Sequence, residues 1–270
     1  GLGEDIGVIV SDDAERVLAA PADLVLVGIY SDMERMFPIF QQCLEHNLNV
    51  ISVGEHHSYP GRLWPEQTRT LDELAKNHGV TITGSGNQDI FMVNLGTLMS
   101  GVCQRIERIT HRSLTDVNNF GPEVAEVTYV DQTLEQFESQ SNTHAPSIYT
   151  TFWDNVASDL DLEVLDITQQ LEPMLAERPH YCRALDRTIE TGRILGIRQR
   201  LKVTTAEGLP MDGENVIQVC DLQADEFKEW EICGEPSFKV RATNIDTGLT
   251  TTTQYVNRIP HVIEAPPGYV

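Results

Sequence analysis

The residue best suited by type and position to do chemistry is Glu55. It follows Gly54 directly after the apolar run 50–53, which is typical of a short buried strand. A carboxylate at the carboxyl end of such a strand can act as a general base and can stabilise a cation. Position alone would equally fit an ordinary glutamate in a surface loop. Glu55 is therefore our candidate catalytic residue, with the surface loop as the alternative.

Two histidines, His56 and His57, follow the glutamate and raise the question of a metal site. The sequence contains no HExxH motif and no third ligand at a suitable spacing, so we predict no metal. We predict instead that His56 contacts substrate.

Aromatic side chains near the same loops could line a substrate pocket, although ordinary packing would explain each of them equally well. Two of them are adjacent on a predicted helix, where their side chains point about 100° apart, so at most one should face the pocket. The candidates are Tyr59, Trp64, Phe91, Phe152 and Trp153.

Two further loops carry residues that could bind a nucleotide. Ser31 and Glu34 form a predicted capping box, and the N–H groups of the helix that it opens could meet a ribose or phosphate. A plain helix cap would also explain Ser31. The loop 84–89 offers side-chain amides that could bind a carboxamide or simply complete a turn. The candidate cofactor-binding residues are Ile29, Tyr30, Ser31, Asn87 and Gln88.

An alternation of strands and helices positions these loops. The patterns predict strands at 22–29, 49–53 and 80–83, and helices at 31–47, 65–77 and 90–102. This order implies a parallel sheet with right-handed crossovers, in which ligands bind beyond the carboxyl ends of the strands. The loops 29–31, 54–64 and 84–89 should therefore meet at one edge.

The second half is predicted to form a mostly antiparallel sheet packed against helices. A strand at 104–114 leaves the first domain. Helices are predicted at 146–160 and 166–177, strands at 192–204, 214–222, 237–243 and 248–256, and a turn at Asp212 and Gly213. The fold class is therefore α/β with an additional α+β domain. We place a dinucleotide-binding domain at 1–104 and a substrate-binding and dimerisation domain at 105–270.

Composition and charge exclude several classes of protein. Hydrophobic residues make up 40% of the 270, enough for a real core. The excess of 41 acidic over 19 basic residues gives a net charge of −22, which disfavours nucleic acids and anionic membranes as partners. The five cysteines are widely spaced and indicate a reducing, cytoplasmic compartment rather than a disulfide framework.

Several segments carry a family resemblance that runs through nearly the whole chain in order. The sequence resembles 2,4-diaminopentanoate dehydrogenases and the related native amine dehydrogenases at a strand-plus-glutamate segment, the next loop, a domain crossover and a C-terminal stretch. These segments are VISVGEHHSYP (50–60), GVTITGSGNQDIF (79–91), GVCQRIERI (101–109), VNRIP (256–260) and APPG (265–268).

The resemblance implies an NAD(P)H-dependent enzyme that interconverts an amine with a carbonyl compound and ammonia, and a homodimer. It also implies a Rossmann-like first domain, similar to that of dihydrodipicolinate reductase, without its first βαβ segment and without a short C-terminal tail. The loop 87–91 departs from the Asn-Pro-Gly-Phe-like loop of the diaminopentanoate branch. That departure favours small aldehydes and ketones as substrates.

Three alternatives remain open at this stage. One is a diaminopentanoate-type amino-acid dehydrogenase, which needs a cation for the substrate carboxylate; Arg62, Arg112 and Arg183 are candidates. Another is a reductase resembling dihydrodipicolinate reductase. The third, from another class, is a catalytically silent binding or dimerisation module. The cofactor is NADP or NAD, and the choice between them is open.

Overall fold

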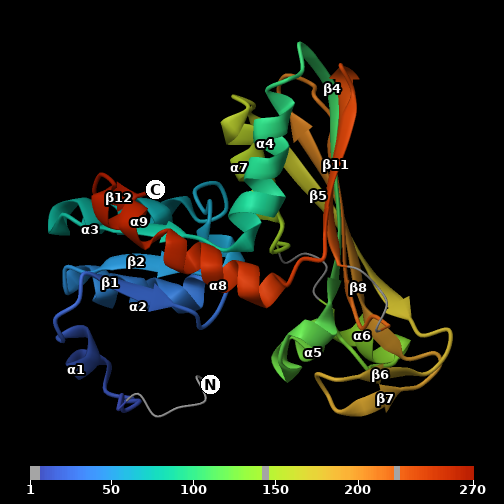
Figure 1. Cartoon of the computed structure of the whole chain (residues 1–270), viewed down its shortest axis with the longest axis horizontal. Helices are drawn as coiled ribbons and strands as arrows, with labels where there is room; N and C mark the ends of the chain where they lie inside the picture. Colours follow the sequence, from blue (N-terminus) through green and yellow to red (C-terminus); the bar gives the residue numbers. More distant parts are fainter. Residues whose placement is uncertain (1–6, 142–145, 222–225) are drawn as a thin grey trace.

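The computed structural model describes residues 7–141, 146–221 and 226–270, and Figure 1 shows its two larger sheets on either side of α4, α7 and α8. The first sheet, here called the parallel sheet, has the strand order β1-β2-β3-β12, and every pairing in it is parallel. The three strands predicted in the first half are confirmed. The strands are β1 (Leu24–Val27), β2 (Asn49–Ser52), β3 (Thr81–Gly84) and β12 (Gly268–Tyr269).

The helices beside this sheet follow from an apolar stripe and from their end signals. In α2 (Met33–Glu45), five buried side chains recur at helical spacing and pack with the sheet. The next helix, α3 (Pro65–His78), starts at a proline and ends where Gly79 takes a φ of 69°, as the pattern predicted. A short helix, α1 (Ala14–Leu18), precedes β1.

The predicted cap of α2 is wrong by one residue. Asp32, and not Ser31, is the N-cap, and its carboxylate accepts from the backbone N–H of Arg35 at 2.8 Å. An aspartate and a serine are both good caps, so the sequence did not decide between them. The consequence is that the Ser31 hydroxyl is free for a different partner.

The predicted helix 90–102 contains a change of helical type. It begins as a π-helix, η2 (Asp89–Asn94), and continues as α4 (Leu95–Ser100). Gly96 lies against the indole of Trp230, where a Cβ would come within 2.7 Å of the ring. The absence of a side chain at Gly96 therefore lets α4 approach the second sheet.

The second sheet, here called the mixed sheet, has the order β11-β10-β4-β9-β8-β5. Only the β4–β9 pairing is parallel, which confirms the prediction of a mostly antiparallel sheet. Its inner face packs against α4 and α7 (Thr150–Asp159), and its outer face is the opposite one. The strands are β4 (Arg105–Asp116), β5 (Val164–Leu175), β8 (Ile194–Thr205), β9 (Met211–Gln218), β10 (Phe227–Glu235) and β11 (Phe238–Thr243).

Short elements cover one end of the mixed sheet. Figure 1 shows them below α8, next to the ends of β4 and β8. They are η3 (Val117–Asn119), α5 (Pro122–Val127), α6 (Leu134–Gln140), and the hairpin of β6 (His180–Cys182) and β7 (Arg187–Ile189). The sequence analysis did not identify these elements.

The helix predicted at 166–177 is wrong, because this segment forms β5. Pro173 would interrupt an α-helix, and the segment instead pairs with β8 over its whole length. Because β5 is the edge strand, a proline that cannot donate a hydrogen bond is tolerated there.

The strand predicted at 248–256 is also wrong, because this segment forms α8 (Thr247–Asn257). Asp246 caps the helix by accepting from the N–H of Leu249 at 2.8 Å, and Tyr255 is buried against Ile51 of the parallel sheet. The capping and packing outweigh the strand preference of the threonine run. With α9 (Ile259–Glu264), this segment returns the chain to the parallel sheet.

Two smaller predictions also fail. The turn predicted at Asp212 and Gly213 lies inside β9, where Gly213 admits the indole of Trp153; a Cβ there would lie 2.8 Å from its Nε1. The C-terminal strand β12, which the sequence analysis did not predict, pairs with β3. Leu222, in the predicted strand 214–222, lies outside the described residues. Among the residues described, no helix is both long and apolar enough to cross a membrane.

Candidate functional site

Glu55 begins a short 3-10 helix, η1 (Glu55–His57), just beyond the carboxyl end of β2. Its side chain is half-buried, and its Oε2 accepts a hydrogen bond from the hydroxyl of Ser31, which follows β1. Its backbone carbonyl accepts from Thr151 Oγ1 of α7 at 2.9 Å. Glu55 is therefore held from both the parallel sheet and a helix of the mixed sheet.

Two glycines allow this arrangement. A Cβ on Gly54 would lie 2.4 Å from His57 Nδ1 and 2.8 Å from the carbonyl oxygen of Tyr30. A Cβ on Gly84 would lie 2.4 Å from the backbone carbon of His57. The loops after the three central strands thus touch at backbone distance, as expected for the carboxyl edge of a parallel sheet.

The two histidines are both buried, and their environments differ in kind. His57 is fully buried, its Nδ1 lies 2.8 Å from Ser52 Oγ, and its ring meets Phe40 edge-on at 4.8 Å. His56 stacks against Trp64 at 4.8 Å, and neither of its ring nitrogens has a hydrogen-bond partner within the described part of the chain.

Both histidine pKa values are lowered. Burial is the main cause in each, and it lowers the pKa of His57 to about 3, with a further contribution from His56. Both rings are therefore neutral at pH 7. No cluster of three or more potential metal ligands occurs among the residues that the structure describes.

The predicted pocket aromatics fall into different environments. Tyr59 is exposed, Trp64 is half-buried on His56, and the carbonyl of half-buried Phe91 accepts from Trp230 Nε1 at 2.7 Å. Both aromatics of α7 belong to the core between this helix and the mixed sheet.

Within that core, Trp153 meets Trp230 at 5.7 Å and fills the space above Gly213. Its neighbour Phe152 meets Tyr149 at 5.7 Å instead. The indole of Trp153 thus packs against the sheet, whereas Phe152 lies on the side of α7 that carries Tyr149.

Tyr149 is a site residue that the sequence analysis missed. It is buried, and its pKa is raised by burial and secondly by the negative charge of Glu55. It lies two residues before Thr151, which holds the backbone of Glu55. Asp154 on the same helix is buried and pairs with Arg62 of the loop after η1 at 2.5 Å. No local pattern distinguishes Tyr149 or Asp154 from ordinary helix residues, so only the fold reveals them.

The predicted cofactor residues lie at the same edge of the parallel sheet. Ile29 is 57% exposed and Tyr30 is 44% exposed, with the Arg35 guanidinium 3.4 Å above the Tyr30 ring. Asn87 and Gln88 are buried in the loop after β3, and Asn87 Nδ2 has no hydrogen-bond partner among the described residues. The exposed apolar residues after β1 and the unpaired buried amide after β3 are groups of the kind that a nicotinamide nucleotide needs.

The α2 N-terminus fits a nucleotide phosphate less well. The Asp32 carboxylate already caps it and brings a negative charge to the end of the helix. The hydroxyl of Ser31 is engaged with Glu55. These contacts favour ribose or carboxamide contacts over a phosphate at this position.

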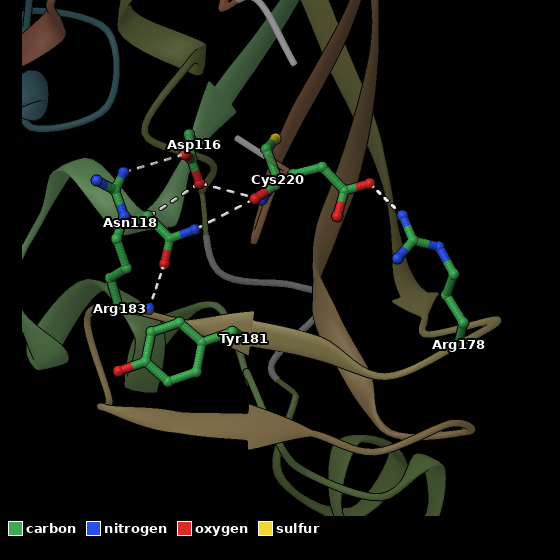
Figure 2. A pocket seen from close by; sticks show the side chains of 7 residues that line it. Asp116, Asn118, Arg178, Tyr181, Arg183 and Cys220 are labelled. Atoms are coloured by element: carbon green, nitrogen blue, oxygen red, sulfur yellow. Dashed lines mark hydrogen bonds and ion pairs between the residues drawn. The ribbon is translucent and has the colours of Figure 1, made fainter. Parts of the chain in front are cut away.

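A separate cavity of about 620 Å³ lies at the far end of β4 and β9 (Figure 2). Its charged groups are paired with one another: Arg183 with Asp116 at 3.8 Å, and Arg178 with Asp221. Asn118 joins the two walls by donating to the carbonyl of Cys220 at 3.3 Å. Because its polar groups satisfy one another, we do not assign the reaction to this cavity.

Two known proteins resemble this chain over nearly its whole length. A curated 2,4-diaminopentanoate dehydrogenase from Acetoanaerobium sticklandii is 27% identical over 98% of this chain and 77% of its own length. The solved amine dehydrogenase of Mycobacterium smegmatis is 33% identical, covers 100% of this chain and 80% of that chain, and superposes with a TM-score of 0.93.

A more distant structure shows the fold alone. The biliverdin reductase of Synechocystis, solved with biliverdin and NADP⁺, is 12% identical and covers 94% of this chain and 74% of that chain, with a TM-score of 0.53. The sequence profile of the 2,4-diaminopentanoate dehydrogenase C-terminal domain matches residues 90–270, more than half of the chain. The resemblance inferred from the sequence is thereby confirmed: the chain belongs to the 2,4-diaminopentanoate dehydrogenase family.

Proposed function

We propose that this protein is an NAD(P)H-dependent amine dehydrogenase that aminates small aldehydes and ketones reductively with ammonia. The observation that carries the proposal is Glu55, a half-buried carboxylate at the carboxyl edge of a parallel sheet in a chain of this family. A carbonyl compound, ammonium, NAD(P)H and one proton give the protonated amine, NAD(P)⁺ and water. The reverse direction is oxidative deamination.

Glu55 does the proton chemistry in this proposal. Its carboxylate takes a proton from ammonium, so that neutral ammonia can attack the carbonyl carbon, and it returns a proton to the oxygen that leaves as water. As the carboxylate again, it stabilises the iminium cation that results. The Ser31 hydroxyl and the anchored backbone of Glu55 fix its position, and the neutral histidines leave its charge unopposed.

The cofactor would lie along the loops that follow β1 and β3, and when bound it supplies the hydride. Ile29 and Tyr30 would provide the apolar surface, Ser31 would contact the nucleotide through its backbone, and the Asn87 and Gln88 amides would orient the carboxamide. The biliverdin reductase of Synechocystis was solved with NADP⁺, and in this proposal the cofactor is NADP or NAD.

The substrate would lie between this edge and α7. In the proposal, the side of the pocket formed by the parallel-sheet domain is lined by His56, Tyr59, Trp64 and Phe91. Phe152 lines the side formed by α7, whereas Trp153 packs in the core. We divide the chain as predicted, with dinucleotide binding in 1–104 and substrate binding and dimerisation in 105–270. The segment 247–270 packs on the first of these units.

We propose a homodimer in which two copies meet through the outer face of the mixed sheet. This face carries both signs of charge in alternation: Arg200 contacts Glu172 at 2.5 Å and Glu214 at 2.9 Å, and Arg108 contacts Asp212 at 2.7 Å. A surface with both signs can complement a copy of itself across a two-fold axis. We place the protein in the cytoplasm, where its five free thiols would stay reduced.

The test measures oxidation of NADPH and NADH by the full-length protein with small aldehydes and ketones, with and without ammonium. We expect ammonium-dependent oxidation, and Glu55→Gln should lower kcat by about 10²- to 10⁴-fold, the usual contribution of a general base. Glu73→Gln, at an exposed carboxylate of α3, is the control and should stay near wild type. Full activity in Glu55→Gln would overturn the role of Glu55, and oxidation independent of ammonium would indicate a carbonyl or imine reductase instead.

A further inference from the structure

The segment 55–62 is attached to α7 at two points. At its start, the backbone carbonyl of Glu55 accepts a hydrogen bond from Thr151 Oγ1 at 2.9 Å. At its end, Arg62 Nε donates to Asp154 Oδ1 at 2.5 Å. Thr151 and Asp154 are three positions apart on α7, so they lie on one face of the helix. The segment that begins with the candidate catalytic residue is therefore held against a single face of α7.

The second attachment is a buried ion pair with an uneven environment. The side chain of Asp154 is 3% exposed, whereas that of Arg62 is 36% exposed. Within the described residues, the other carboxylate oxygen, Asp154 Oδ2, has no hydrogen-bond partner. Burial raises the pKa of Asp154, and the hydrogen bond and charge of Arg62 oppose that rise. Removing Arg62 would therefore leave a buried carboxylate without its cation, which is strongly unfavourable.

The helix that receives both attachments is itself fixed to the mixed sheet. Trp153 packs against Trp230 at 5.7 Å, and its indole occupies the space above Gly213. Both tryptophans belong to the core between α7 and this sheet. Thr151 and Asp154 are therefore fixed points on the mixed-sheet side, although the segment that they hold comes from the parallel sheet.

Between the two attachments, two buried polar side chains are left without partners. His56 stacks on Trp64 at 4.8 Å, but neither of its ring nitrogens makes a hydrogen bond within the described part of the chain. The buried hydroxyl of Ser58 is likewise unpaired there. Because these two side chains add no directional contact, the ion pair of Arg62 with Asp154 carries more of the task of fixing this stretch.

We propose that Arg62 and Asp154 are positioning residues for Glu55. Their ion pair fixes the segment 55–62 against α7 and so sets the place of the Glu55 carboxylate relative to α7, which lines the other side of the proposed substrate site. This inference rests on the proposed function, because it concerns the placement of the proposed general base. Neither side chain contacts the substrate in this proposal, so the loss of the pair slows the chemical step more than it weakens the binding of an uncharged substrate.

The first test measures kcat and KM for butanone, with ammonium and the preferred cofactor, in Arg62→Ala, in Asp154→Ala and in the double variant. Each variant should lower kcat roughly 10- to 100-fold with little change in KM, since a shift of about 1 Å in a catalytic group has an effect of this size. The double variant should lose about as much as one single variant, because both substitutions remove the same interaction. Arg69→Ala is the matched control, because it breaks an exposed pair with Glu73 on α3 and should leave kcat unchanged.

Guanidinium rescue separates positioning from a general loss of stability. Arg62 is partly exposed, so its truncation opens a path from solvent to Asp154. Guanidinium chloride, far below denaturing concentrations, should raise kcat of Arg62→Ala several-fold, whereas sodium chloride at the same ionic strength should not. Asp154→Ala lacks the carboxylate that would bind the ion and should not respond.

Three outcomes would overturn the inference. They are an unchanged kcat in folded Arg62→Ala, losses in the single variants that multiply in the double variant, and an equal response of Arg62→Ala and Asp154→Ala to guanidinium. If Arg62→Ala does not fold, the double variant leaves no carboxylate buried without a cation and carries the kcat test. A wild-type kcat in that variant refutes the inference.

The failure of the proposed function is distinguishable from the failure of this inference. If the wild type aminates no carbonyl compound, the proposed function fails, and amide hydrogen exchange still decides the role of the ion pair. Exchange in the segment 55–64 should be faster in Arg62→Ala and in Asp154→Ala than in the wild type and Arg69→Ala. Unchanged exchange in both variants refutes the inference, and this measurement needs neither substrate nor cofactor.

Discussion

Replacing Gly84 by alanine is expected to move Glu55 without altering any catalytic side chain. A new Cβ would lie 2.4 Å from the carbonyl carbon of His57 and 2.4 Å from the backbone nitrogen of Ser58, about 1 Å inside ordinary contact. Both atoms are backbone, so rotation of a side chain cannot relieve the clash. Since Gly84 is fixed by pairing with Ser52, the 3-10 helix that starts at Glu55 must give way.

The size of that displacement sets the expected effect. A misplacement of about 1 Å in a catalytic group lowers the rate by about 10²-fold, and overpacking lowers the free energy of unfolding by about 1–3 kcal/mol. The assay is kcat/KM for ammonium-dependent NAD(P)H oxidation, together with denaturant unfolding. Gly61→Ala, in the loop after η1, is the matched control, because no atom lies within 4 Å of its new Cβ. A Gly84→Ala enzyme within about twofold of wild type would refute the claim that this contact positions Glu55.

The remaining predictions concern pH and assembly. Burial, with smaller contributions from His56 and Lys228 respectively, lowers the pKa of His57 and of His111 to about 3, whereas unfolded histidine titrates near 6.5. The unfolded chain therefore gains protons that the folded protein does not, and the free energy of unfolding should fall by about 1.6 kcal/mol per histidine between pH 6.5 and pH 5. Guanidinium unfolding at both pH values measures this fall. In His57→Asn the fall should be smaller than in the wild type by the contribution of one histidine, and a fall equal to that of the wild type would contradict the lowered pKa of His57. The wild type should sediment as a dimer, and Arg200→Glu should sediment as a monomer. A monomeric wild type would contradict the proposed dimer.

The parallel half of the fold could be predicted because its signals are local. Each strand is a short apolar run, α3 begins at Pro65, and Gly79 ends it in the left-handed region. The carboxyl-edge rule then brings the loops together, and Glu55 does touch Ser31 there. The sequence could not reveal that Asp32 takes the cap and leaves the Ser31 hydroxyl for Glu55.

The mixed half was harder because tertiary packing decides its elements. The mixed polarity of the segment 166–177 favours a helix. The segment forms a strand because it pairs with β8 at the edge of the sheet, where Pro173 is tolerated. The threonine run of α8 favours a strand by its local preference. It forms a helix because Asp246 caps its first turn and Tyr255 packs against Ile51 of the parallel sheet. In both segments the local preference is weak, and a partner far along the chain determines the outcome.

Three buried polar residues that lie side by side on the inner face of the mixed sheet show a further limit of prediction from the sequence. They are Asn215, Ser113 and Lys228, and the sequence alone does not reveal that they are neighbours. Alternation along β4 and β9 tells which residues share a face, but it does not tell which strands are neighbours. Asn215 reaches Ser113 only because β4 and β9 pair in parallel inside an otherwise antiparallel sheet. The strand-end rule thus brings Glu55 and Ser31 together from the sequence alone. The neighbours of a residue in the mixed sheet depend instead on which strands pair and in which register.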